Sequence, residues 1–166
     1  GHDASGGYRS NKGSIYEGGH RVPMIIRWPK GGVPQGQAYG NLTGIQDLYR
    51  TVADIANAYV PVGQAVDSIS FKKQVLGQCT APHRVHQMTQ TIESLGDLAW
   101  RENEWKLIMR VDGKPIGLYN LEKDPFEEND LLSDPKMASR VADMKASFLA
   151  LEPEGMIRPV KRKKKK

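Results

Sequence analysis

The sequence predicts an α/β fold that ends in a small α+β subdomain. Two groups of elements carry this prediction: an apolar strand followed by an amphipathic helix early in the chain, and three short strands closed by a terminal helix later. The chain has 166 residues, enough to bury a sizeable core. A hydrophobic content of 39% and a charged content of 26% are typical of soluble globular domains.

The first strand is expected at Val22–Trp28. This segment is apolar, contains β-branched residues and is bounded by Pro23 and Pro29, so we expect it to be short and largely buried. Residues 1–13 before it, and residues 30–42 after it, are polar and glycine-rich and predict loops.

An amphipathic helix is expected to follow. Thr43 and Gln46 match a capping box at its start, and Pro61 and Gly63 end the pattern. A short helix is plausible near Ser70–Leu76. The apolar residues of the longer helix recur at spacings of three and four, which places them on one face: Ile45, Leu48, Val52, Ile55 and Tyr59.

The last third of the chain predicts three strands and a helix. Alternating segments at 98–101 and 104–109 surround a tight turn, and 117–121 gives the third strand. Asp134 and Pro135 fit the N-cap and first position of a helix. Its apolar stripe, which predicts packing against the core, consists of Met137, Val141, Met144, Phe148 and Leu151.

The basic character of the chain is concentrated at its end. The net charge is +5, yet residues 161–166 are all Lys or Arg, so the remainder is near neutral. A run of like charges is typical of a solvated tail, and we expect residues 156–166 to be disordered. A tail that binds an anionic partner is the alternative, although the near-neutral body disfavours nucleic acid.

Three separated groups of motifs stand out along the chain. The first reads Lys12, Glu17-Gly18-Gly19, Arg21-Val22-Pro23 and Trp28-Pro29. The second reads Asp47-Leu48-Tyr49-Arg50-Thr51 and Asp67-Ser68-Ile69-Ser70. The third reads Arg101, Trp105-Lys106-Leu107-Ile108, Leu118-Tyr119-Asn120-Leu121, Asp124-Pro125, Glu127 and Asp130-Leu131. In this order they resemble the end of the type I, formylglycine-dependent sulfatases (arylsulfatases) of the alkaline phosphatase-like superfamily. The second group departs from the family, which often has Pro at Arg50 and Gly at Ser68.

The resemblance implies how the chain is organised. Residues 1–60 would complete the catalytic α/β domain, and residues 61–155 would form the smaller C-terminal subdomain, a short antiparallel sheet packed by a helix. Because the chain starts at Gly1 on a segment rich in Gly and Ser, we expect a fragment of a longer protein. Such parents are usually periplasmic or secreted.

The resemblance also implies sulfate ester hydrolysis, with sulfated carbohydrates as candidate substrates. In the family, a formylglycine made from the Cys of C-x-P-x-R is the nucleophile, and Ca²⁺ holds the sulfate. Cys79 does not fit, because Pro82 stands one position too late and the family's Cys lies far upstream of the Lys motif. No Asp-Asn pair precedes Lys12, and nothing gathers the roughly six to eight oxygen ligands of Ca²⁺. We therefore expect no metal site in this chain, and an inactive fragment.

Lys12 is the catalytic candidate. The matching family lysine reaches the substrate sulfate, where an ammonium stabilises oxygen charge. His2 and Arg9 precede it and are predicted to bind substrate at the pocket rim: Arg9 by pairing with a sulfate or carboxylate, His2 by donating to a sugar hydroxyl or the leaving oxygen. Plain exposed loop residues are the alternative for both.

Several other residues are interpreted as structural. The glycines of Glu17-Gly18-Gly19 permit a positive φ or a close backbone approach, and a Glu17–Arg21 ion pair can form. His20 is interpreted as a structural histidine. The aromatic residues Trp100, Trp105 and Tyr119 predict core packing, with a carbohydrate platform as the alternative.

Two other functions compete with the sulfatase interpretation. One is a non-catalytic module that binds sulfated or other polyanionic chains through Arg9, Lys12 or the basic tail. The other is a phosphoryl-transfer enzyme of the same superfamily, which the Glu-Gly-Gly-x-Arg-Val-Pro segment disfavours.

Overall fold

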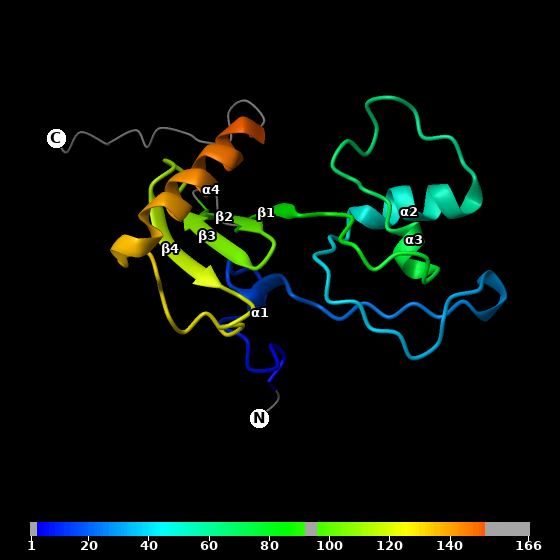
Figure 1. Ribbon diagram of the computed structural model, residues 1–166, viewed down its shortest axis with the longest axis horizontal. Coiled ribbons are helices and arrows are strands. Elements are labelled where there is room, and N and C mark those ends of the chain that lie inside the picture. Colours follow the sequence, from blue (N-terminus) through cyan, green and yellow to red (C-terminus); the bar gives the residue numbers. More distant parts are fainter. Residues whose placement is uncertain (1–2, 92–95, 152–166) are drawn as a thin grey trace. The chain divides into compact units, whose positions relative to one another are not determined.

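The computed structural model describes residues 3–91 and 96–151 (Figure 1). The described chain divides into two compact units: residues before Pro23 together with those after Gln87 form the first, and Pro23–Gln87 forms the second. Neither junction coincides with the expected boundary between residues 1–60 and 61–155, and those ranges remain predictions for the parent protein. The predicted tail, residues 156–166, lies outside the described residues.

A four-stranded sheet forms the centre of the first unit. Its order is β1 (His86–Gln90), β2 (Leu98–Glu102), β3 (Trp105–Met109) and β4 (Pro115–Asn120). β2, β3 and β4 pair in antiparallel fashion, so that Leu107 lies opposite both Trp100 and Leu118. The three predicted strands are confirmed. β1 is a fourth strand that the sequence does not predict, because its residues lack a clear alternation of apolar and polar side chains.

One face of the sheet is covered by helix α4 (Ala138–Leu151), as Figure 1 shows. The Asp134 carboxylate accepts a hydrogen bond from the Lys136 amide (2.9 Å), which confirms the predicted cap, and a 3-10 turn η2 (Pro135–Met137) leads into α4. Leu151 was predicted to belong to the apolar stripe of this helix, but it is exposed. The buried cluster on this face consists of Leu98, Trp100, Leu107, Met109, Leu118, Met144 and Phe148.

The opposite face is covered by the N-terminal segment. Strand residues alternate between faces, so Ala99, Ile108 and Tyr119 point away from α4. Ile15 is buried against them, and Tyr16 packs at their edge. The short helix α1 (Glu17–His20) follows directly. The sheet therefore supports the loop that precedes Ile15. Burial of Trp100 and Tyr119 confirms core packing and argues against a carbohydrate platform there.

The second unit holds helices α2 (Asp47–Ala56) and α3 (Lys72–Val75) and a 3-10 turn η1 (Pro29–Gly31). The capping box at the start of α2 is wrong. The Thr43 hydroxyl donates to the Asn41 carbonyl, while the Asp47 carboxylate accepts from the Gly44 amide (3.0 Å) and so satisfies the turn before the helix. Among the described residues, no helix is long and apolar enough to cross a membrane.

The predicted buried strand at Val22–Trp28 is also wrong. The segment is extended but belongs to no strand, and Ile25 is 90% exposed. The physical reason is that residues with high β-propensity form a strand only when another strand pairs with them. No described segment does so here. The apolar face of α2 is similarly open, with Val52 60% exposed.

Truncating Phe148 tests the core beneath α4. Phe148 is 1% exposed and packs edge-on against Trp100 at 5.6 Å between ring centroids. Phe148→Ala should lower the free energy of unfolding by about 3–5 kcal/mol. Leu149→Ala, at a 47% exposed neighbour on α4, is the control and should change it little. Urea unfolding followed by tryptophan fluorescence measures both, and equal effects would contradict this packing.

Candidate functional site

Lys12 lies on an exposed loop of residues 8–14. Within the described residues, its ammonium makes no hydrogen bond and no ion pair. Two neighbours have left-handed backbones, Ser10 with φ 67° and Gly13 with φ 94°. This conformation costs a non-glycine residue about 1–2 kcal/mol, so the contacts of the loop must hold Ser10 in place. The loop therefore presents, on a constrained backbone, a cation that has no partner among the described residues.

Helix α1 stands directly against this loop because its middle residues are glycines. The Gly18 amide donates to the Arg9 carbonyl (3.0 Å). A Cβ atom on Gly18 would lie 2.6 Å from that oxygen and would overlap the Ser10 carbonyl, while a Cβ on Gly19 would overlap Ser14. Of the two roles expected for the paired glycines, the structure therefore supports close approach. A larger side chain here would push the Lys12 loop outward.

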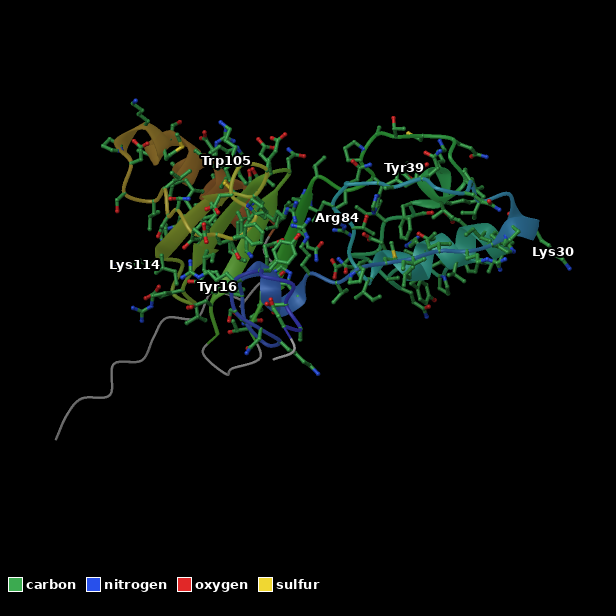
Figure 2. All side chains as sticks on the ribbon, turned by 90° about the horizontal axis from the view of Figure 1, so that it is seen from below. Tyr16, Lys30, Tyr39, Arg84, Trp105 and Lys114 are labelled. Atoms are coloured by element: carbon green, nitrogen blue, oxygen red, sulfur yellow. The ribbon has the colours of Figure 1, made fainter. Side chains whose placement is uncertain are left out.

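Arg9 ties the same loop to the sheet. Its Nη1 donates to the Tyr119 hydroxyl (3.1 Å) and to the Glu127 carbonyl (2.8 Å). Its guanidinium also lies 3.8 Å from the centre of the Tyr16 ring, which Figure 2 labels beside the N-terminal segment. A substrate contact by Arg9 remains a prediction. His2, the other predicted substrate contact, lies outside the described residues.

A buried charge network lies beneath the loop. Lys106 donates to Glu17 Oε1 (3.0 Å) and lies 2.8 Å from Glu127 Oε1, an ion contact without hydrogen-bond alignment. Glu127 Oε2 accepts from the Glu17 amide (2.6 Å). All three residues are at most 1% exposed. Arg21 and Arg101 approach Glu17 Oε2 at 3.5 and 3.8 Å, which confirms the Glu17–Arg21 ion pair.

The network sets the charge states of Glu17 and of the neighbouring His20. Burial acts to raise the pKa of Glu17, but the charge and hydrogen bond of Lys106 outweigh it and hold that pKa below the usual 4.5. Burial, followed by the charge of Lys106, lowers the pKa of His20 below 6.5. At neutral pH the site therefore contains an ionised Glu17 and a neutral His20, whose Nε2 lies 3.2 Å from the Ile15 carbonyl.

The family model for the C-terminal region of N-sulphoglucosamine sulphohydrolase matches residues 7–154. The chain belongs to that sulfatase family. The match contains the Lys12 loop, the glycines of α1 and all three members of the buried network.

Individual relatives agree. An N-acetylgalactosamine-6-O-sulfatase of Bacteroides thetaiotaomicron is 28% identical over 159 residues, covering 87% of this chain and 30% of the relative. Rat steryl-sulfatase is 32% identical over 110 residues, covering 63% of this chain and 19% of the relative. The chain therefore spans less than a third of these relatives and corresponds to the C-terminal portion of a sulfatase.

Solved structures share the fold. A structure from work on glycosaminoglycan metabolism by B. thetaiotaomicron has a TM-score of 0.74 at 26% identity, over 87% of this chain and 32% of its own. A structure of Ps i-CgsB in complex with k-i-k-neocarrahexaose has a TM-score of 0.70 at 32% identity, over 85% and 31%. These likenesses confirm the predicted fold class, the end of a sulfatase catalytic domain with a small α+β subdomain.

The second sulfatase motif forms a buried network of its own in the second unit. Asp47, fully buried, accepts from Arg84 Nε (3.0 Å) and Nη2 (2.6 Å), and His83 Nε2 lies 3.1 Å away. Its Oδ1 also accepts from the Ile69 amide (2.9 Å), and the Thr51 hydroxyl accepts from the Phe71 amide (3.0 Å). The motif residues on α2 therefore hold the 67–71 segment.

These hydrogen bonds set the ionisation of Asp47. Burial acts to raise its pKa, but the bonds from Arg84, from the Ile69 and Gly44 amides and from His83 outweigh burial. The pKa falls from 3.8 to about 2. Asp47 is thus a structural anion and does not transfer protons near neutral pH.

Sequence reasoning missed the burial of Lys106 and Arg84. For Lys106 a signal was present: it occupies an inward position within the apolar Trp-Lys-Leu-Ile strand, where a lysine must find a carboxylate. Arg84 carried no such signal. Cys79 is an unpaired thiol. Within residues 3–91 and 96–151, no group of three His, Cys, Asp or Glu side chains could hold a metal ion.

Removing the charge of Lys106 tests the buried network. Lys106→Met removes the buried cation that contacts both carboxylates, so the free energy of unfolding should fall by about 3–5 kcal/mol. Adding Glu17→Gln and Glu127→Gln to this variant should restore part of the loss, because the repulsion disappears. Urea unfolding followed by tryptophan fluorescence measures each variant. Lys114→Met, at an exposed lysine of the same unit, is the control, and an equal loss there would contradict the network.

The pH dependence of the second unit tests Asp47. Its pKa is depressed in the folded state, so its contribution is complete above about pH 5 and is lost progressively as the pH falls toward 2. This contribution amounts to roughly 2 kcal/mol, and Asp47→Asn should remove the pH dependence in that window. Urea titrations followed by the amide NMR signal of Ile69 measure it. A variant that keeps the wild-type slope would contradict the assignment.

Proposed function

We propose that the complete protein hydrolyses sulfate esters of carbohydrates, and that Lys12 of this chain contacts the sulfate group. This proposal rests on the ammonium of Lys12, which has no partner in the described part of the chain and lies on a constrained loop next to a network built from the sulfatase motifs. Relatives support the carbohydrate class: one is an N-acetylgalactosamine-6-O-sulfatase, and Ps i-CgsB was solved with k-i-k-neocarrahexaose.

The contribution of Lys12 is electrostatic. Negative charge on the sulfate oxygens and the departing alcohol oxygen grows as the ester S–O bond breaks. An ammonium fixed nearby stabilises that charge without reorganising at the moment of reaction. The left-handed Ser10 and the close contact with Gly18 restrict the loop before substrate arrives, so less ordering remains for binding.

The family generally implies Ca²⁺ and a formylglycine in the parent. The described residues do not fit either group, since they gather no metal-binding cluster and Cys79 lacks the C-x-P-x-R context. We therefore assign both groups to the part of the sulfatase outside this chain and expect the 166-residue chain alone to be inactive. A periplasmic or secreted parent is part of the same proposal.

Activity of the complete protein tests the role of Lys12. Lys12→Ala should lower kcat for an aryl sulfate or a sulfated sugar by about 10²–10³, as expected when one transition-state contact is lost. Lys123→Ala, at an exposed lysine of the same unit, is the control. If Lys12→Ala retains wild-type kcat and KM, the assignment is wrong. Polyanion binding without hydrolysis, lost with Lys12, would favour the binding-module alternative.

A further inference from the structure

We propose that Arg9 is a positioning residue for Lys12, which acts by clamping the loop to the sheet rather than by touching substrate. This inference rests on the proposed function of Lys12. It replaces the simpler expectation that a loop arginine beside a sulfate-binding lysine also binds the anion.

The contacts of Arg9 already use two of the five N–H donors of its guanidinium. Both hydrogens of Nη1 are committed, one to the Tyr119 hydroxyl and one to the Glu127 carbonyl. Its planar face is stacked on Tyr16. A guanidinium can meet a sulfate through two parallel N–H bonds, and the arm that ends in Nη1 is occupied here.

The acceptors of Arg9 are rigid parts of the fold. Tyr119 is 3% exposed on β4, opposite Lys106 in the sheet register. Glu127 is fully buried with a left-handed φ of 58°, in a turn that directs its carbonyl to Arg9 while its carboxylate meets Lys106 and the Glu17 amide. The contacts that hold Arg9 are therefore anchored to the buried charge network through Glu127.

The clamp lies immediately before the turn that carries Lys12. The Arg9 carbonyl accepts from Gly18, and Ser10 follows in its left-handed conformation. The Ser14 amide then donates to the Asn11 carbonyl (3.1 Å), which closes the turn around Lys12. Because Arg9 is held through both its backbone and its side chain, it fixes where this turn begins. Loss of the side-chain contacts should let the turn shift while the sheet stays intact.

A direct contact between Arg9 and substrate would change the kinetic constants in a different way. Arg9 is partly exposed, and a substrate contact through its remaining donors would weaken binding when it is changed. A positioning role instead lowers kcat, because a displacement of about 1 Å at a catalytic group can cost up to 10²-fold in rate. Tyr119 separates the two roles. Its ring is buried against Ile15 and Tyr16, and its hydroxyl accepts a hydrogen bond from Arg9, so removing the hydroxyl alone tests the Arg9 contact.

The experiment compares Arg9→Lys, Tyr119→Phe and the double variant in the complete sulfatase, with Arg110→Lys as control. The Arg110 side chain is half-exposed and forms a 3.9 Å ion pair with Asp112. We expect each single variant to lower kcat about tenfold with KM within about twofold, and the double variant to be no worse than the stronger single. Amide hydrogen exchange at residues 10–13 should accelerate in all three and not in the control.

Two results would overturn the proposal. One is Arg9→Lys raising KM while kcat and loop exchange stay at wild-type values. The other is Tyr119→Phe, which removes a single hydroxyl and keeps the buried ring, having no effect on either. Lys12→Ala, measured alongside, tests the proposed function separately. If it leaves activity intact, the proposed function and the positioning role both fail, whereas normal exchange in the Arg9 variant overturns only the clamp.

Discussion

The contact of Lys106 with Glu17 and Glu127 is the interaction on which the first unit depends. Taking a single charge out of water costs several kcal/mol, and the interior tolerates it only when the partner is adjacent and the remaining polar atoms are satisfied. Here one cation serves two carboxylates, and one of them also accepts from the backbone of the other. Three residues from the first and third motif groups, far apart in sequence, therefore meet at one buried point.

The buried network also restricts the surface loop that carries Lys12. Glu17 begins α1, whose glycines admit the Lys12 loop to within hydrogen-bonding distance of the helix backbone. Glu127 shapes the turn whose carbonyl holds Arg9. The sulfatase motifs on this unit therefore have two roles. Buried contacts hold the base of the loop and come from Glu17, Lys106 and Glu127. Lys12 presents its charge to solvent.

Sequence patterns predicted the elements whose stabilising contacts come from residues nearby in the chain. The period-two strands around Trp100 and Leu107 and the Asp134 cap were predictable because their stabilising contacts lie close in sequence. The apolar strand around Lys106 indicates that this lysine is buried, but its partner Glu17 lies 89 residues away and could not be derived from the neighbours of Lys106. Val22–Trp28 has strand-forming residues, but no strand in the described ranges pairs with it, so local preference gave the wrong answer. Lys12 was found through resemblance, while the contacts of Arg9 depend on the tertiary fold.

A crystal structure of the complete protein with a non-hydrolysable sulfate ester analogue would show whether the buried network holds a loop that offers Lys12 to sulfate. We expect a sulfate oxygen about 3 Å from Lys12 Nζ, with Lys106 still between Glu17 and Glu127 and Arg9 still bonded to Tyr119 and Glu127. A structure in which Lys12 points away from the sulfate, or in which Arg9 leaves the sheet to bind the anion, would contradict it.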